Sequence, residues 1–348
     1  MKANVLYGIN DLRVVRDYEV PKLKPGEVLV KVGYAGICGS DVARVFKTGT
    51  YHFPTVIGHE FSGTVVDVKA GVDSKWIGKR VGVFPLKPCF ECPSCKAGSY
   101  ETCDSYDYLG SRCDGGFEEF VAVPEWNLLE LPDSVGLDVA AMLEPVSVAI
   151  HALNRVQTVK GKTVAIIGPG TIGNIVAKVA KCRGASKIIM IGRTQAKLDF
   201  ALSESADVII NSKTQNVAEE VRRCTEGLGA DIVVEGTGAS QSLSIALGIA
   251  NKGCDVILMG NPIEDFSLEK NVYWTILRKQ LSLYGTWNSS FKAMKDDWIE
   301  ALRLIESGQL NLAPLISHRL AFDQLLDGLK IMENRDILSN KVILKINE

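Results

Sequence analysis

The chain has 348 residues, of which 46% are hydrophobic, so it is long enough for two ordinary domains with a core each. Its formal net charge of -2 and the lack of any run of like charge exclude a basic surface for nucleic acid. The N-terminal residues lack the order of a signal peptide, and no apolar run reaches the length of a membrane span. We therefore predict a cytoplasmic protein that has neither nucleic acid nor a membrane as its partner.

Short strands dominate the prediction for the first 150 residues. Residues 28–32, 62–68 and 80–83 are β-branched, partly alternating and separated by glycine and proline. This pattern predicts a β-rich domain.

The pattern changes near residue 150, where residues 146–153 predict an apolar helix. Continuous apolar strands then alternate with helix-length segments, at residues 163–167, 187–191, 207–210, 231–234 and 255–259. Such strands are typical of a parallel sheet covered on both faces. Residues 341–345 predict a last strand. We expect one domain at residues 1–150, completed by residues 285–348, and an α/β domain at residues 151–284.

A dinucleotide fingerprint, G-x-G-x-x-G, follows the strand predicted at residues 163–167. Gly168 permits the tight turn, Gly170 lets the backbone approach a pyrophosphate, and Gly173 lets helix and strand pack closely. Thr171 and Ile172 lie between these glycines, where a helix N-terminus would face the anion. The alternative is a glycine-rich turn without a ligand, which the surrounding βα units disfavour.

The position after the second α/β strand departs from the usual pattern for NAD. An acidic residue there normally binds the ribose hydroxyls, whereas this chain has Gly192, Arg193 and Thr194. Glycine leaves room for a 2′-phosphate, and arginine can bind it through paired hydrogen bonds. We therefore predict a preference for NADP(H) over NAD(H). In the alternative, Arg193 is an ordinary solvated charge and the enzyme uses NAD(H) weakly or equally.

Four of the nine cysteines lie close together in the sequence: Cys89, Cys92, Cys95 and Cys103. Four thiolates close a tetrahedral shell without an open position, which predicts a structural zinc site. An iron-sulfur cluster or a set of free thiols is the alternative.

A second set of residues has the composition of a catalytic zinc site. Cys38, His59 and Glu60 together offer a thiolate, an imidazole and a carboxylate, which leave one position for water or substrate. Taken singly, Cys38 is also consistent with a small buried residue and His59 with a polar group in a turn. Their joint presence with a dinucleotide fold favours a catalytic zinc ion.

These motifs occur in an order that resembles the zinc-dependent medium-chain dehydrogenase/reductase family over the whole chain. They comprise Gly58-His59-Glu60, the four cysteines, the segment at residues 114–120 and the fingerprint at residues 168–173. The resemblance implies an α/β fold class with a GroES-like β-rich catalytic domain and a Rossmann domain whose parallel sheet is doubly wound. It also implies a homodimer or homotetramer.

Within the family, the chain resembles the polyol dehydrogenases and their relatives that act on polyol phosphates. This resemblance rests on residues 38–41, 44–47, 108–112, 143–145 and 285–287, although Ala43 replaces the histidine of the sorbitol and threonine branches. It implies that Glu60 and Glu144 both approach the catalytic zinc and that Ser40 relays a proton. It also suggests contacts with the substrate, to a phosphate by Arg44, Lys47 and Arg112 and to the pocket lining by Trp287.

The predicted reaction transfers a hydride between a secondary alcohol and the nicotinamide ring, with zinc stabilising the alkoxide. One alternative keeps this chemistry but gives it a simple alcohol or aldehyde as substrate. A second alternative is a protein that binds zinc and dinucleotide without catalysing a reaction.

Overall fold

The computed structural model describes residues 1–262, 265–334 and 336–347. The chain forms two compact units, Met1–Ser147 with Ser289–Glu348, and Val148–Asn288. No helix in the described ranges is long and apolar enough to span a membrane.

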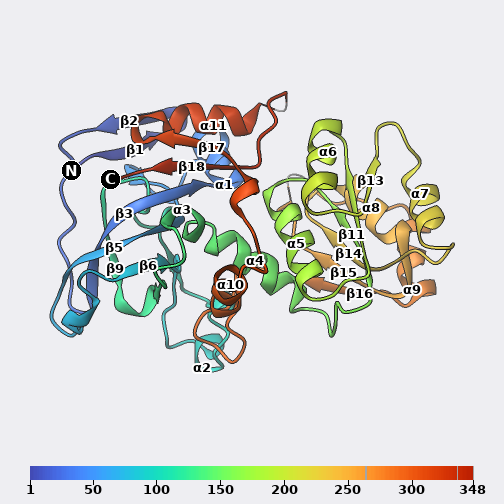
Figure 1. The fold of residues 1–348 in the computed structure, drawn as a ribbon, viewed down its shortest axis with the longest axis horizontal. Helices are drawn as coiled ribbons and strands as arrows, with labels where there is room; N and C mark the ends of the chain where they lie inside the picture. The colour runs from blue at the N-terminus through green and yellow to red at the C-terminus, as the bar shows by residue number, and fades with distance from the viewer. Residues whose placement is uncertain (263–264, 335, 348) are drawn as a thin grey trace. The chain divides into compact units, whose positions relative to one another are not determined.

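A seven-stranded sheet forms the centre of the first unit. Its strand order is β10-β6-β5-β3-β18-β17, and β9 pairs with β3 as a further neighbour. The bounds are β3 Glu27–Ile37, β5 Glu60–Val68, β6 Arg80–Val83, β9 Phe120–Pro124, β10 Leu128–Glu130, β17 Ile316–Ala321 and β18 Lys341–Lys345. The three strands predicted in the first 150 residues and the last predicted strand are confirmed. Figure 1 shows the red strand β18 beside the blue strand β3, so the C-terminal segment completes this sheet.

Two smaller sheets and several short helices complete the first unit. The small sheets contain β1 Ala3–Gly8, β2 Asp11–Val15 and β4 Thr55–Val56, and β7 Leu86–Lys87 with β8 Asp107–Tyr108. The α-helices are α1 Gly39–Ala43, α2 Pro93–Lys96, α3 Leu137–Ala140, α10 Asp297–Glu306 and α11 Leu325–Glu333. The π-helix η1 spans Arg44–Thr48, and the 3-10 helices are η2 Ser74–Trp76, η3 Tyr100–Thr102, η4 Glu125–Asn127, η5 Ala313–Leu315 and η6 Phe322–Gln324. Helix α4, Leu143–Leu153, begins in this unit, three residues earlier than predicted.

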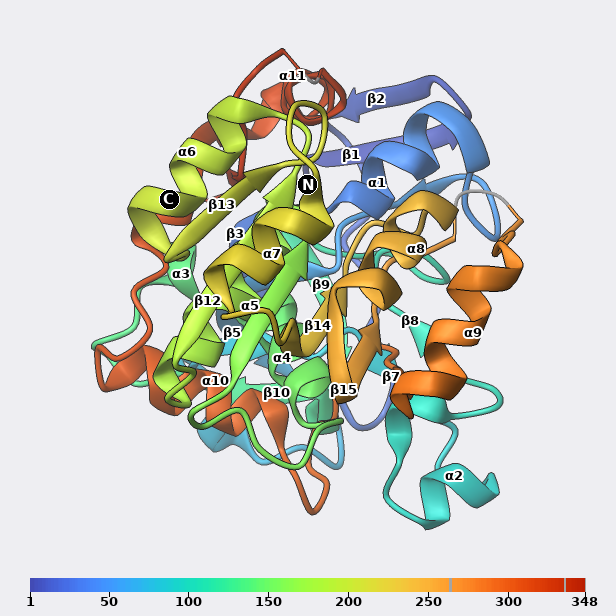
Figure 2. The same ribbon diagram turned by 90° about the vertical axis from the view of Figure 1, so that its right-hand side faces the viewer.

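The second unit contains a six-stranded sheet in which every adjacent pair is parallel. Its order is β13-β12-β11-β14-β15-β16, most of which can be followed in Figure 2. The bounds are β11 Thr163–Ile167, β12 Lys187–Gly192, β13 Val208–Asn211, β14 Ala230–Glu235, β15 Ala250–Leu258 and β16 Ser282–Gly285. The five predicted apolar strands are confirmed. The sixth strand, β16, was missed by the sequence analysis because its residues form no continuous apolar run.

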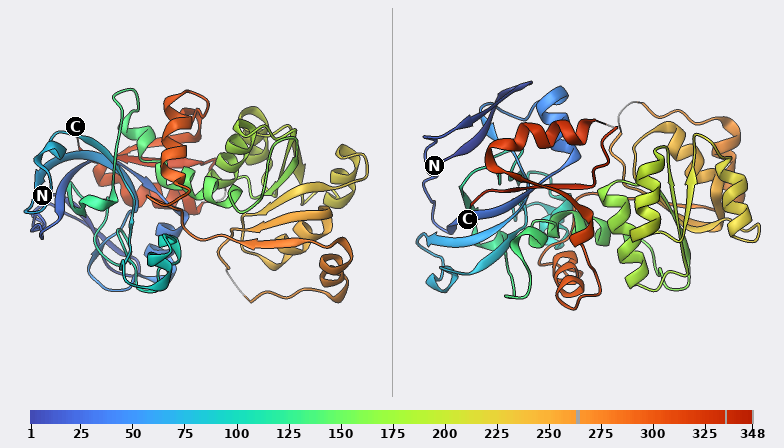
Figure 3. Two further views of the ribbon diagram at one scale, coloured as in Figure 1. Left: turned by 90° about the horizontal axis from the view of Figure 1, so that it is seen from below. Right: turned by 45° about the horizontal axis from the view of Figure 1, so that its top comes forward.

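Helices cover both faces of this parallel sheet. Strand order runs outward in two directions from β11, so the connecting helices fall on opposite faces, α5 and α6 on one and α7, α8 and α9 on the other. The left view of Figure 3 shows these two layers. The helix bounds are α5 Thr171–Cys182, α6 Gln195–Glu204, α7 Val217–Cys224, α8 Ser240–Ile249 and α9 Lys270–Lys279. The Rossmann class predicted from the sequence is confirmed.

Candidate active site

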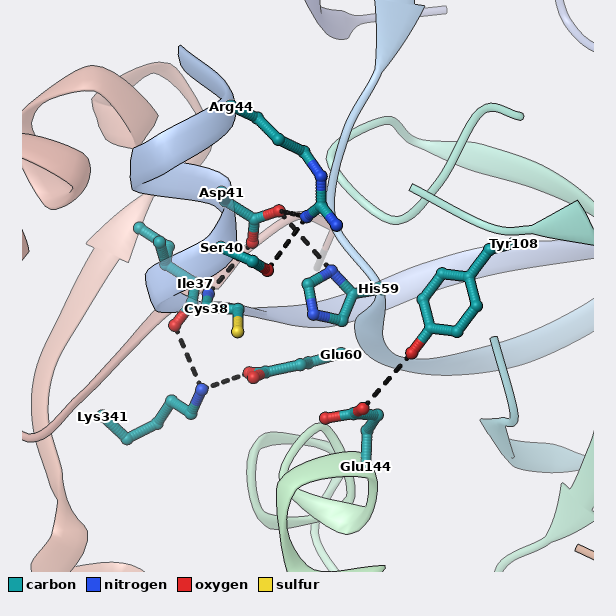
Figure 4. Close-up of polar contacts among 10 residues, drawn as sticks. All are labelled: Ile37, Cys38, Ser40, Asp41, Arg44, His59, Glu60, Tyr108, Glu144 and Lys341. Carbon is teal, nitrogen blue, oxygen red and sulfur yellow. Dashed lines mark hydrogen bonds and ion pairs between the residues drawn. The ribbon is translucent and has the colours of Figure 1, made fainter. Parts of the chain in front are cut away.

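Cys38, His59 and Glu60 come together because β3 and β5 pair antiparallel. Gly36 near the end of β3 lies opposite Glu60 at the start of β5, so Cys38 and His59 extend from adjacent strand ends. One ligand atom from each of the three side chains lies within 4.8 Å of the others. Figure 4 shows the three side chains gathered around one point. His59 and Glu60 are buried and Cys38 is partly buried. A soft thiolate, an imidazole and a carboxylate in this arrangement suit a zinc ion.

Asp41 orients the imidazole of His59. The carboxylate of Asp41 accepts hydrogen bonds from the backbone N–H of Cys38 at 3.0 Å and from Arg44 at 2.9 Å. Nδ1 of His59 faces Asp41 Oδ1 at 3.5 Å and has no hydrogen-bond partner among the described residues. Because Nδ1 is turned to Asp41, Nε2 points to the side of Cys38 and Glu60 (Figure 4). A carboxylate behind a histidine is the usual support of a metal ligand.

The charges around His59 favour a cation. Burial alone would lower the pKa of His59, but Asp41 and Cys38 outweigh it and hold that pKa well above its ordinary value. Burial likewise would raise the pKa of Asp41, yet His59 and Arg44 bring it below its ordinary value. A buried cluster that holds a positive charge in this way is electrostatically suited to a metal ion.

Two carboxylates, those of Glu60 and Glu144, lie at the cluster and have different partners. Glu60 is paired with the ammonium of Lys341, and both side chains are buried. Glu144 instead accepts a hydrogen bond from the hydroxyl of Tyr108 at 3.4 Å. Burial, assisted by Glu60, raises the pKa of Glu144 to about 7, although His59 and Lys341 act against that rise. Glu60 belongs to the set of ligand atoms within 4.8 Å, whereas Glu144 lies outside this set.

Lys341 and Tyr108 are site residues that the sequence analysis did not identify as functional. Lys341 opens a strand 281 positions away from Glu60, and no local motif marks it. Tyr108 lies in a segment that the family resemblance includes, yet its contact with Glu144 depends on folding. Burial and the neighbouring Glu144 raise the pKa of Tyr108 well above its ordinary value, so its hydroxyl keeps the proton that it donates.

The four clustered cysteines have the geometry of a single-metal site. Their sulfur atoms lie within 4.8 Å of one another, with separations of 3.9 Å between Cys89 and Cys95 and between Cys92 and Cys103. Zn–S bonds of about 2.3 Å in a tetrahedron place sulfur pairs about 3.8 Å apart. Backbone N–H groups, led by that of Asp104, lower the pKa of Cys92 to about 6. This compact set suits one ion better than a multi-iron cluster, which holds its thiolates farther apart.

The four proposed substrate contacts fall into different surroundings. Arg44 is bound to Asp41 and donates to Ser40 Oγ at 3.0 Å, so its charge is largely compensated. Lys47 is exposed in η1. Arg112 is half-buried between two tyrosine rings. Trp287 lies in the second unit and is 53% exposed.

The fingerprint glycines lie in the turn between β11 and α5. Gly168 has φ +117°, a conformation that L side chains rarely adopt. A Cβ at Gly173 would clash with the carbonyl oxygen of Gly168, whereas one at Gly170 would meet no protein atom within 4 Å. Helix α5 begins at Thr171, so its first N–H groups, including that of Ile172, lack partners within the helix. This turn can bind a phosphate.

Gly192 has a packing role in addition to any role toward a cofactor. A Cβ at Gly192 would lie 2.6 Å from Cγ of Pro169, so the fingerprint itself requires a small residue here. Arg193 is exposed, and Thr194 is the residue before α6. The predicted preference for NADP(H) therefore rests on the lack of a carboxylate directly after β12 and on Arg193, and not on the small size of Gly192.

Two family profiles match the chain. Residues 24–133 match the alcohol dehydrogenase GroES-like domain, and residues 171–307 match the zinc-binding dehydrogenase domain. The chain belongs to the zinc-dependent alcohol dehydrogenase family, as its motifs predicted. It is a zinc- and NAD(P)-dependent dehydrogenase of that family, so its predicted class of enzyme is confirmed.

Two relatives cover most of the chain. Galactitol 1-phosphate 5-dehydrogenase of Escherichia coli K12 is 35% identical over 95% of this chain and 96% of its own length. Sorbitol dehydrogenase of Bombyx mori is 33% identical and covers 95% of each chain. The predicted resemblance to polyol and polyol phosphate dehydrogenases is confirmed.

Solved structures show the same fold. Galactitol-1-phosphate dehydrogenase from Escherichia coli has a TM-score of 0.93, 35% identity and coverage of 99% of this chain and 100% of its own. An alcohol dehydrogenase from E. coli CFT073 with NADH has a TM-score of 0.91 and 29% identity, with 99% of each chain covered. A zinc-binding dehydrogenase from Sinorhizobium meliloti 1021 bound to NADP has a TM-score of 0.90 and 27% identity, with coverage of 99% and 98%.

Proposed function

We propose that this enzyme oxidises a secondary hydroxyl of a polyol or polyol phosphate to the ketose, reversibly, and prefers NADP(H) to NAD(H). In this proposal residues 1–150 with 285–348 form the catalytic domain, and residues 151–284 bind the dinucleotide. The observation that carries it is the set of ligand atoms from Cys38, His59 and Glu60 within 4.8 Å. The names of the relatives support a polyol or its phosphate as the substrate class.

The catalytic zinc in this proposal is held by Cys38 and His59 together with Glu60 or Glu144. Zinc supplies Lewis-acid stabilisation of the substrate oxygen when it is bound. The ion pair between Lys341 and Glu60 and the hydrogen bond between Tyr108 and Glu144 keep each carboxylate in a defined position near that shell.

Ser40 is the group proposed to accept the substrate proton. Its Oγ already accepts a hydrogen bond from Arg44 at 3.0 Å, so the orientation of the hydroxyl is constrained. Arginine has no acceptor, and Ser40 must therefore direct its own proton away from Arg44. That arrangement suits a relay between the reacting oxygen and the solvent or cofactor ribose.

A second zinc ion has a structural role in this proposal, bound by Cys89, Cys92, Cys95 and Cys103. Their 3.9 Å sulfur separations support a closed tetrahedral shell. Such an ion would order the loop and would not take part in hydride transfer.

The dinucleotide is proposed to bind the second unit through two segments. Its pyrophosphate would face Gly168, Gly170, Thr171, Ile172 and Gly173 at the start of α5. Arg193 and Thr194 would lie next to the adenosine ribose, where Arg193 favours a 2′-phosphate.

We also propose that the enzyme is a homodimer or homotetramer. Within the described residues, β16 pairs only with β15 and leaves one edge of the sheet open. Exposed apolar side chains accompany it, with Leu283 at 39%, Trp274 at 43% and Leu277 at 59% exposure. An open edge with apolar neighbours favours burial against a second copy of the chain.

The test is a substrate panel on the zinc-loaded enzyme. Hexitols, their phosphates and simple alcohols are compared as substrates by kcat/KM, each with NADP and with NAD. The proposal expects polyol-type substrates to exceed simple alcohols and NADP to exceed NAD. A higher kcat/KM with ethanol, or a clear preference for NAD, would refute the corresponding half. Light scattering of the same sample tests the oligomer.

A further inference from the structure

Arg112 differs from Arg44 and Lys341 because no carboxylate pairs with it among the residues that the structure describes. Its guanidinium carbon lies 4.5 Å from the ring centre of Tyr51 and 4.3 Å from that of Tyr106. It donates one hydrogen bond to the backbone carbonyl of Tyr106 at 3.0 Å, and it lies 3.5 Å from the hydroxyl of Tyr51. The two rings therefore fix the orientation of the guanidinium group, and its remaining N–H donors are available to a ligand.

The turn that carries Arg112 is tied to the metal cluster. The backbone N–H of Arg112 donates to the carbonyl of Tyr108 at 2.9 Å. The Tyr108 ring lies 5.8 Å from the ring of His59, and its hydroxyl donates to Glu144 at 3.4 Å. The ring of Tyr106 lies 6.2 Å from that of Tyr108. Arg112 is thus linked to the metal ligand His59 through the rings of Tyr106 and Tyr108.

A further contact fixes the backbone of this turn. Nε2 of His52 lies 3.0 Å from the carbonyl oxygen of Arg112, and Nδ1 of His52 lies 3.1 Å from that of Pro54. The imidazole therefore links the Arg112 turn to the segment that precedes β4. A positioned guanidinium loses little conformational entropy when it binds a ligand.

The two alternative cations are less suitable as anion receptors. The charge of Arg44 is compensated by Asp41, whose carboxylate is fully buried. Lys47 is exposed and offers only a point charge on a flexible chain. A planar guanidinium held between rings suits an anion with two or more oxygens, such as a phosphate.

We propose that Arg112, clamped by Tyr51 and Tyr106, binds the phosphate group of a polyol phosphate whose hydroxyl reacts at the metal cluster. This inference rests on the proposed function and makes the phosphate ester, rather than the free polyol, the substrate class. Tyr51 and Tyr106 are positioning residues, since they act through Arg112. The anion belongs to the substrate, because the clamp is connected to the metal ligands by Tyr108.

The test measures binding by calorimetry to the zinc-loaded full chain. The probes are galactitol 1-phosphate and sorbitol 6-phosphate, their parent hexitols, and galactonate as a carboxylate anion. The wild type should bind a phosphate at least about 10-fold more tightly than its hexitol, and Arg112→Gln should lose about 10- to 100-fold for the phosphate alone. Arg16→Gln is the matched control, because Arg16 is an exposed arginine paired with Asp323 outside the site, and it should change either affinity by less than about 3-fold.

The clamp has its own variants. Tyr106→Leu should weaken phosphate binding about 5-fold or more. Tyr106→Phe keeps the ring and should bind phosphate about as tightly as the wild type. Equal affinity of the wild type for esters and hexitols, or tighter Arg112-dependent binding of galactonate than of either ester, would overturn the inference.

Turnover separates this inference from the proposed function. If hexitols and esters are both oxidised and Arg112→Gln alters neither, the proposed function stands and the inference is wrong. If neither is oxidised but ester binding still depends on Arg112, the anion site stands and the proposed function is wrong.

Discussion

The ammonium of Lys341 forms an ion pair with the carboxylate of Glu60, and both side chains are buried. Lys341 also donates to the carbonyl of Ile37 at 3.1 Å, so it joins the end of β3 to the starts of β5 and β18. A Cβ at Gly36 would clash with the Glu60 carboxylate, which explains the glycine opposite it. The last strand of the chain thereby completes the surroundings of the metal cluster.

Replacement of Lys341 by Met should destabilise the protein by about 3–5 kcal/mol, because it leaves the Glu60 carboxylate buried without a partner. Urea unfolding of the protein in the presence of a zinc chelator measures this loss, since no ion then compensates the Glu60 carboxylate. The double variant Lys341→Met with Glu60→Gln should recover most of it, since no uncompensated charge then remains. A single Lys341→Met variant as stable as the wild type would show that the pair contributes nothing.

Replacement of Cys95 by Ser should remove one of two zinc ions per chain, because it breaks the four-sulfur set. The apparent melting temperature should fall by several degrees, as expected when a structural ion is lost. Cys224→Ser is the matched control, since Cys224 lies outside both ligand sets and donates only to the carbonyl of Val221. Unchanged zinc content in Cys95→Ser would contradict a four-cysteine site.

Much of the fold could be predicted from local pattern. The buried strands of the second unit are continuous apolar runs, and residues 163–167 coincide with β11. Strand β16 escaped prediction because an edge strand is only partly buried, and Ser282, Leu283 and Gly285 are exposed. Its position depends on pairing with β15, which no local pattern encodes.

The candidate site was predictable only where its residues form motifs. Cys38 and His59 stand in short segments whose composition indicates a metal. Lys341 and Glu60 are separated by 281 positions, and their pairing follows from the register of β3 with β18 and β5. At Gly192 the sequence pattern suggests a role toward the cofactor but does not reveal the packing reason for glycine. A Cβ there would clash with Pro169, which only the folded structure shows.

Replacement of Ser40 by Ala should lower kcat about 100-fold, because the proposed relay hydroxyl is lost. Zinc content should stay unchanged, since Ser40 is not among the grouped ligand atoms. Steady-state kinetics and metal analysis of the same preparation measure both quantities. Ser40→Thr retains a hydroxyl and should keep most of the activity; full activity in Ser40→Ala would remove Ser40 from the mechanism.

Glu118 provides a test of pH-dependent stability away from both metal sites. Its side chain is buried, and Oε2 has no hydrogen-bond partner within the described part of the chain. Burial raises the pKa of Glu118 well above its ordinary value of 4.5, and the nearby Asp114 adds to the rise. The folded state therefore holds a proton that the unfolded state releases above about pH 4.5.

The sign of the effect follows from this difference. The contribution of Glu118 to stability is fully present below about pH 4.5 and is lost as the pH rises from 4.5 toward the raised pKa of the folded state. Over that range the unfolded chain is stabilised by releasing a proton that the folded chain keeps. Glu118→Gln cannot titrate, so it should be more stable than the wild type at pH 8 by about 1 kcal/mol or more. Its advantage should shrink toward pH 5, as thermal unfolding at both pH values would show.

Glu119→Gln is the matched control, since the partly exposed Glu119 is paired with Lys2. An advantage for Glu118→Gln that is equal at pH 5 and pH 8 would mean that this carboxyl does not carry the pH dependence.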